Sequence, residues 1–200
     1  MVKSQADIVS AVIIVVLALS LTSSALLWGL PLIQKRQDSV MVTRAHNFFN
    51  KELVSKIKSV ANVGGTEKAI LDVKGIWTLN VTKNTISFMF FSKASDKATG
   101  VWVGEGCDSV EGFKGQEGIF GEEEPCLVCA FSKEVSGGYE ITYEIGCRTL
   151  TSDGKKYKIE FVKPTGGLTT STGKGIAISR QSVSQVDPNL IITKIEILLL

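Results

Sequence analysis

An uncharged apolar segment near the N-terminus constrains this chain more than any other feature. Residues 8–34 form a run of 27 positions without Asp, Glu, Lys or Arg, and most of them are Val, Ile, Leu or Ala. A helix needs about 20 such residues to cross the hydrocarbon core of a bilayer. The segment therefore predicts a membrane-spanning helix. At about 1.5 Å per residue it is longer than the core, so it must tilt or bend, and Pro31 is well placed for a bend.

A cleaved secretory signal peptide is the alternative interpretation of this segment. The apolar region of such a peptide usually has about 7 to 15 residues and ends at a small-residue cleavage site, which Ser23, Ser24 and Ala25 resemble. The apolar run continues past these residues through Trp28 to Ile33. We therefore expect the helix to be retained.

A short polar stretch stands directly before the apolar run and consists of Lys3, Ser4, Gln5, Ala6 and Asp7. It resembles the class III signal peptides of archaeal type IV pilins and archaellins, in which a prepilin peptidase cuts before the apolar helix and leaves the helix attached. The resemblance implies a leader of residues 1–4, cut between Ser4 and Gln5, with Lys3 as the basic residue of the motif. It implies an extracellular filament whose subunits, anchored in the membrane before assembly, join through this helix. The implied partners are other copies of the chain, the peptidase and a membrane assembly platform.

Residues 38–61 show helical periodicity in place of uniform apolarity. The apolar positions recur at spacings of three and four: Val42, Ala45, Phe49, Leu53, Ile57 and Val60. The sequence Asn62-Val63-Gly64-Gly65 then supplies a helix stop. We expect one helix over residues 5–63, whose first part packs among neighbouring subunits and whose second part is an amphipathic stalk covered by its own domain.

Beyond Gly65 the periodicity changes to two, which is typical of strands. The expected strands are residues 70–74, 76–81, 86–91, 101–103, 127–131, 139–145, 157–162, 176–179 and 190–199. Turn sequences such as Ser136-Gly137-Gly138 and Ser152-Asp153-Gly154 separate them. The last run carries apolar residues at alternate positions and should pair deep in a sheet. The pattern predicts an antiparallel β-sandwich over residues 66–200, so the fold class is α+β with a type IV pilin-like layout.

All four cysteines fall in this second part, at Cys107, Cys126, Cys129 and Cys147. A zinc site needs two closely spaced ligand pairs and a thioredoxin-like site needs its CxxC at a helix start, whereas here one close pair opens an apolar strand. We expect two disulfides, with one disulfide or free thiols as the alternative. Cys126 and Cys129 point to opposite faces of a strand, so each should bond a distant partner. Of the three pairings, we favour Cys107 with Cys126 and Cys129 with Cys147.

The 18 residues between Cys107 and Cys126 are rich in Gly and acidic residues, with one Lys against six Asp or Glu. Such a segment is typically a solvated loop. Two further hypotheses are a divalent-cation site and, through Glu122, Glu123 and Glu124, a contact with a neighbouring subunit.

Two features favour an exterior location for the second part. The cysteines fit an oxidising compartment, and Asn80-Val81-Thr82 is an N-glycosylation sequon at Asn80. We set these above the basic residues Lys35, Arg36 and Arg44, which taken alone favour a cytoplasmic side.

The remaining composition argues against other functions. A formal net charge of +2 gives no field for holding nucleic acid, and His46 is the only histidine, so no Ser-His-Asp or multi-histidine set forms in one chain. We expect no catalytic residue, no metal site and no cofactor. The predicted function is a structural subunit of a pilus-like or archaellum-like filament serving adhesion or motility. The alternative is a single-pass membrane-anchored extracellular β-sandwich that binds another surface component.

Overall fold

The computed structural model describes residues 2–105, 107, 113 and 116–200, with side chains from Ser10 onward. The chain divides into two compact units, Met1–Asp38 and Ser39–Leu200. Each unit is described by itself. The second unit begins at Ser39, so the amphipathic residues 39–63 belong to the same unit as the sheets.

The first unit is helical. Helix α1 (Val2–Asn47) begins in it and continues through Pro31 without interruption, and its last turns belong to the second unit. The predicted long apolar helix is therefore confirmed. A proline inside a helix removes one backbone hydrogen bond but does not end it here.

The helical part of the second unit contains a π-helix where the sequence pattern predicted a continuous α-helix. The π-helix η1 (Phe48–Leu53) joins α1 to α2 (Val54–Val63), and Gly64 follows with a φ of 87°. The buried positions Ala45, Phe49, Leu53 and Ile57 are spaced by four, which in an α-helix drifts by about 40° at each step. The wider π turn takes up this drift and keeps all four side chains on the buried face.

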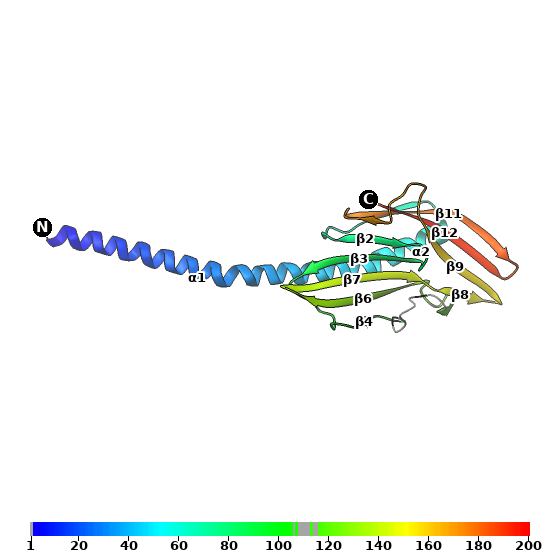
Figure 1. Ribbon diagram of the computed structural model, residues 1–200, viewed down its shortest axis with the longest axis horizontal. Coiled ribbons are helices and arrows are strands. Elements are labelled where there is room, and N and C mark those ends of the chain that lie inside the picture. Colours follow the sequence, from blue (N-terminus) through cyan, green and yellow to red (C-terminus); the bar gives the residue numbers. More distant parts are fainter. Residues whose placement is uncertain (1, 106, 108–112, 114–115) are drawn as a thin grey trace. The chain divides into compact units, whose positions relative to one another are not determined.

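Twelve strands in the described residues form two six-stranded sheets (Figure 1). Sheet A has the order β1 (Thr66–Ile70), β11 (Gly175–Asp187), β12 (Leu190–Leu199), β9 (Lys155–Val162), β8 (Thr149–Ser152), β5 (Glu117–Ile119). Sheet B has the order β10 (Thr170–Ser171), β2 (Ile76–Asn80), β3 (Thr85–Ser92), β7 (Gly138–Cys147), β6 (Cys126–Val135), β4 (Trp102–Val103). The α+β class and the two sheets agree with expectation, as does the deep position of the last strand.

Two features of the sheets differ from those expected. The sheets are mostly, not wholly, antiparallel, because β12 pairs with β9 and β5 pairs with β8 in parallel. The chain reaches β12 from β9 through β10 and β11, a connection long enough for a parallel crossover. The strand expected at residues 70–74 is misplaced, since β1 is Thr66–Ile70. Leu71 and Val73 lie beyond the end of β1 and are buried. Residues 71–74 therefore alternate between apolar and polar side chains, although they are not part of a strand.

One hydrophobic core unites both sheets and the buried face of residues 39–63. Helix α2 contacts β1, β11 and β12 of sheet A and β6 of sheet B. The Phe49 ring lies with its centroid 5.2 Å from that of Tyr143 and 5.7 Å from that of Trp77, and Trp77 lies 4.6 Å from Phe88. All six apolar positions predicted to form the buried stripe of this helical segment are buried.

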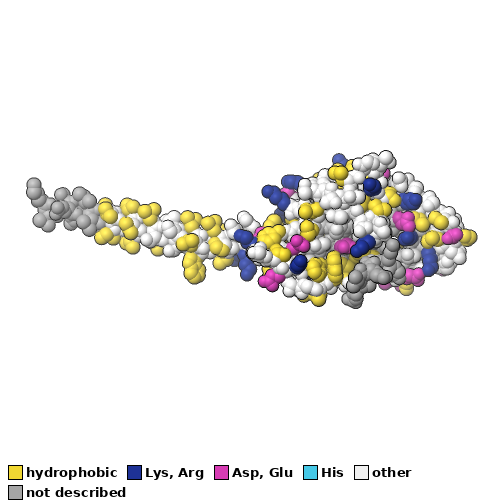
Figure 2. Space-filling view, viewed as in Figure 1, with side chains coloured by type: hydrophobic (Ala, Val, Ile, Leu, Met, Phe, Trp, Pro, Cys, Tyr) yellow, Lys and Arg dark blue, Asp and Glu magenta, His cyan; other side chains and the backbone are white. Residues whose placement is uncertain are grey.

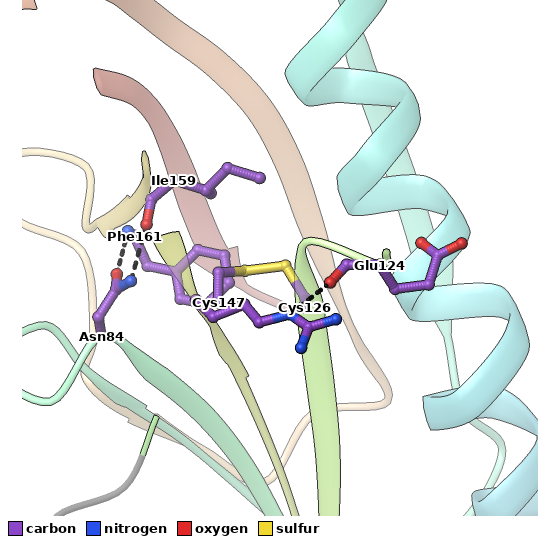
Figure 3. The surroundings of a disulfide bond; sticks show 7 residues. Asn84, Glu124, Cys126, Cys147, Ile159 and Phe161 are labelled. Carbon is purple, nitrogen blue, oxygen red and sulfur yellow. Dashed lines mark hydrogen bonds between the residues drawn. A yellow bond between two sulfur atoms is a disulfide. The ribbon is translucent and has the colours of Figure 1, made fainter. Parts of the chain in front are cut away.

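Asn84, in the turn between β2 and β3, joins sheet B to sheet A (Figure 3). Its side-chain Nδ2 donates to the Ile159 carbonyl at 2.7 Å, and the Phe161 backbone N–H donates to its Oδ1 at 2.6 Å. The residue has a φ of 57°, a left-handed conformation that Asn tolerates better than most side chains. The turn geometry thus aims a polar side chain at the backbone of β9.

Candidate functional site

The exposed apolar surface of the first unit is the first candidate functional surface. From Ser10 to Gln37 every described side chain is exposed, including Leu27 at 75% and Trp28 at 82%, whereas Asp38 is partly buried. Figure 2 shows apolar side chains along this helix. The best window has a mean hydropathy of 2.3, and none of it is buried. Soluble proteins rarely expose contiguous apolar patches of this extent. The helix is long and apolar enough to cross a membrane, and this length and composition are compatible with a membrane anchor or a signal sequence.

The processing residues Lys3, Ser4 and Gln5 lie within α1. Their side chains are outside the described part of the structure. Cleavage between Ser4 and Gln5 stays a prediction.

The four cysteines form two disulfides, as predicted, but with the other partners. Cys107 bonds Cys129 and Cys126 bonds Cys147, so the pairing favoured from the sequence was wrong. Strand β6 does present Cys126 and Cys129 to opposite faces of sheet B. Cys126 and Cys147 belong to the main core, whereas Cys107 and Cys129 cluster with Phe113 and Leu127 on the outer face.

The hairpin register explains this pairing. Strands β6 and β7 are joined by a two-residue turn at Ser136 and Gly137, so Val135 opposes Gly138 and, counting back along both strands, Cys126 opposes Cys147. Their Cα atoms lie 3.9 Å apart. A two-residue turn fixes the register of a hairpin, so this pairing was derivable from Ser136-Gly137-Gly138 once both strands had been recognised.

Two disulfides favour an extracellular location, because such bonds persist in oxidising compartments. With loops of about 20 residues, each bond stabilises the fold by about 3 kcal/mol in the chain-entropy model. The second unit is therefore suited to a cell exterior.

Two of the three predicted contact glutamates bind within the chain. Glu124 pairs with Lys58 at 2.8 Å, and Glu123 accepts a hydrogen bond from the Ile119 N–H at 2.7 Å and lies 3.6 Å from Arg148. Among the described residues, the Glu122 carboxylate has no ion-pair or hydrogen-bond partner, while its backbone N–H donates to the Ile119 carbonyl at 3.3 Å. Residues 108–112 and 114–115 of the acidic segment lie outside the described residues, and so do those carboxylates of the cation hypothesis. Within the residues the structure describes, no three His, Cys, Asp or Glu are grouped to hold a metal ion.

The sequon lies at the end of β2 and in the turn that follows it. Asn80 is half-buried, and its Oδ1 accepts a hydrogen bond from the Lys83 N–H at 2.9 Å. Val81 and Thr82 are exposed in the turn. Glycosylation of Asn80 stays a prediction.

His46 lies on the helical face next to the core. Its Nδ1 is 3.1 Å from Asn50 Nδ2, and its ring centroid is 6.3 Å from that of Tyr143. These contacts give His46 a place in the packing of α1 against sheet B.

Comparisons with protein-family models, curated proteins and solved structures find no match to this chain. Function is therefore inferred from the residues and their geometry.

Proposed function

We propose that this chain is the structural subunit of an extracellular filament of the type IV pilus or archaellum kind, assembled through its apolar N-terminal helix. The observation that supports it most is the unpartnered apolar helix of the first unit, which is continuous in sequence with a disulfide-bonded domain of two sheets. In the membrane, lipid covers this helix before assembly. In a filament, the helices of other copies replace the lipid.

The distribution of small residues on the helix supports close packing between helices. At about 100° per residue, Ala11, Ala18, Thr22, Ala25 and Gly29 fall within about 60° of one another. Lipid gives apolar helices no hydrophobic reason to associate, so close backbone approach at small residues supplies the attraction. Thr22 suits this face because its hydroxyl donates to the Ala18 carbonyl at 2.7 Å, which satisfies its polar group within the helix.

Assembly follows from the symmetry of the contact. A head-to-tail contact that does not close into a ring generates an open helix, so one helix–helix interface repeated between copies extends without limit. The proposed partners are therefore other copies of this chain, a prepilin peptidase that removes residues 1–4, and a membrane assembly platform. The filament would serve adhesion or motility.

The test is the intact mass of the native protein in sheared extracellular material and in membranes. We expect the sheared fraction to contain a form that begins at Gln5. Replacing Ser4 with Phe should block cleavage and remove the sheared form, because the peptidase must accommodate this side chain. A matched control is Ser55→Phe, at an exposed position of α2.

A form that keeps residues 1–4 and stays in membranes, unchanged by Ser4→Phe, contradicts the filament. That result favours the single-pass membrane-anchored binding protein, which needs no cleavage.

A further inference from the structure

Sheet A is longer than the helix that covers it, and this leaves a cavity. Helix α2 ends at Val63, while β11 and β12 continue to Asp187 and from Leu190. The uncovered part of the sheet, the C-terminal turn of α2 and the turn at residues 120–125 enclose about 510 Å³. The floor is formed by side chains of four adjacent strands: Leu150, Tyr157, Ile159, Val183, Ile191 and Thr193. Strand register sets them in two rows, since Tyr157 opposes both Leu150 and Ile191, and Thr193 opposes both Ile159 and Val183.

Phe120 and the Tyr157 ring of the floor form a stacked aromatic wall at one side of this cavity. Phe120 stacks on Tyr157 with ring centroids 4.4 Å apart, and Phe120 remains 46% exposed. A stacked pair with an open face offers a flat apolar surface to a ligand ring.

Arg148 supplies hydrogen-bond donors beside the rings. Its side chain is 8% exposed, and its Nε donates to the Glu124 carbonyl at 3.0 Å. Its Nη2 lies 3.6 Å from the Glu123 carboxylate, which is longer than a hydrogen bond. For the described residues, the Glu124 carbonyl is the one acceptor that the structure gives this guanidinium, so donors remain for a ligand in the cavity.

Residues at the rim of the cavity provide hydrogen-bond acceptors, and one of them binds the C-terminal end of α2. The Glu122 carboxylate and the Asn62 amide line the cavity. Arg180 Nη1 donates to the carbonyls of Ala61 at 3.3 Å and Asn62 at 3.2 Å, which satisfies the end of α2. The cavity therefore combines fixed donors, free acceptors and an aromatic wall in one unit of the chain.

The charge balance narrows the class of ligand. The lining holds four cationic side chains, Lys58, Arg148, Lys158 and Arg180, and three anionic ones, Glu122 to Glu124. Lys58, Lys158 and Arg148 have acidic neighbours, and Arg180 donates to the carbonyls of Ala61 and Asn62. A carboxylate or phosphate ligand at Arg148 would therefore meet the glutamates beside it. A purely apolar ligand leaves the donors of Arg148 without acceptors. A hydroxyl group both donates and accepts, so a ring with several hydroxyls satisfies both kinds of group.

The geometry points to a binding site for a neutral carbohydrate in this cavity. One face of a sugar ring presents C–H groups, which lie against Phe120 and Tyr157. Its hydroxyls accept from Arg148 and donate to Glu122 and Glu123. This function is independent of filament assembly, and it would give the second unit a ligand of its own.

The test is saturation-transfer difference NMR on the full chain in a zwitterionic detergent that has no sugar headgroup. The probes are maltose, lactose, N,N′-diacetylchitobiose and, as an aromatic carboxylate, hydrocinnamate, each added alone. We expect at least one disaccharide to receive saturation at its ring protons. Phe120→Ala should weaken that binding about tenfold, the upper end of what an aromatic contact contributes. Glu122→Gln should weaken it less, because an amide oxygen still accepts.

The matched control is Phe91→Ala, which removes a Phe of similar exposure from β3 of sheet B, outside the cavity. It should bind the disaccharide as the parent does, and thermal unfolding should show that both Phe variants are folded. The proposal is overturned if no disaccharide binds, if hydrocinnamate alone binds, or if Phe120→Ala binds as tightly as the parent. Loss of the sheared filament form in Phe120→Ala, without sugar binding by the parent, assigns the cavity to a neighbouring copy instead.

Discussion

At the scale of single residues, burial of a polar side chain changes its pKa, and Glu144 is an example. Glu144 lies on the outer face of β7, opposite Cys129 of β6. Burial raises the pKa of the Glu144 carboxyl because a low-dielectric environment disfavours the charged form, and a hydrogen bond with Thr85 acts in the opposite direction. The folded state therefore binds this proton more tightly than the unfolded state does.

Glu144→Gln should stabilise the protein at neutral and alkaline pH. In the parent, the contribution of this group is fully present below the unfolded pKa and is lost as the pH rises through the higher folded pKa. The amide has no charge to bury and still accepts from Thr85. Urea unfolding at several pH values should show the largest gain near pH 8 and a gain that shrinks toward pH 4. Glu140→Gln, on the same face of the same strand, is the control, and an equal gain in both variants contradicts the assignment.

Replacing Asn84 tests the bond between the sheets. Asn84→Gly keeps the left-handed φ of 57° but removes both hydrogen bonds to β9, and should cost about 1 to 3 kcal/mol of the free energy of unfolding. Asn84→Ala should cost about 1 to 2 kcal/mol more, because alanine is strained in that conformation. Denaturant unfolding of both variants measures the two contributions separately. If both unfold as the parent does, this side chain does not hold the sheets together.

At the scale of secondary structure, the periodicity of the sequence predicted the helices better than the strands. The apolar run and the three-and-four spacing were sufficient for the helices, because both depend on residues close in sequence. The π-helix was missed although Ala45, Phe49, Leu53 and Ile57 carry its spacing of four. Strands β5, β8 and β10 have two to four residues each, too few for a periodicity to be recognised. The parallel pairing of β9 with β12 leaves no local signal, because alternation is the same in either direction.

Candidate sites formed by residues close in sequence can be predicted from the sequence, whereas sites formed by distant residues cannot. A candidate site defined by a local sequence, such as the sequon at Asn80, can be read from the sequence, and its glycosylation stays a prediction. The cavity could not be read in this way, because Phe120, Tyr157 and Arg148 come from separate segments that only the strand order of sheet A brings together. The disulfide pairing is intermediate between these two kinds of site. Cys126 and Cys147 are distant in sequence, but the short turn between β6 and β7 fixes the register that places them opposite each other.

Pairs of cysteine replacements distinguish the two pairings of the disulfides. Removing Cys107 and Cys129 together should leave one closed disulfide and no free thiol, because Cys126 still faces Cys147. Removing Cys107 and Cys126 together should leave two free thiols, since Cys129 and Cys147 then lie on opposite faces of sheet B. Thiol titration of the unreduced, denatured variants gives the count. Thiols in the first variant and none in the second contradict the structure.

At the scale of the whole molecule, the division between the units falls within a helix. Residues 39–63 contribute eight buried side chains to the core shared with the sheets: Val42, Ala45, Phe48, Phe49, Leu53, Val54, Ile57 and Val60. None of the described side chains of the first unit, residues 10–38, belongs to this core. The compact unit that contains this core is Ser39–Leu200, and a boundary drawn where the helix ends would remove part of its core.

Two truncations test this division. A chain of residues 39–200 keeps the complete core and both disulfides, and should fold as a monomer in buffer without detergent, because the exposed apolar helix is gone. A chain of residues 64–200 lacks the eight helical side chains. At about 1.5 to 3 kcal/mol for each large apolar side chain buried, their loss amounts to about 10 to 20 kcal/mol, as much as the whole stability of a typical domain, so this chain should not fold. Near-UV circular dichroism and thermal unfolding of both chains are the measurements. A cooperative transition in the shorter chain would show that the sheets form their own core, and the absence of one in the longer chain would show that the first unit is needed for folding.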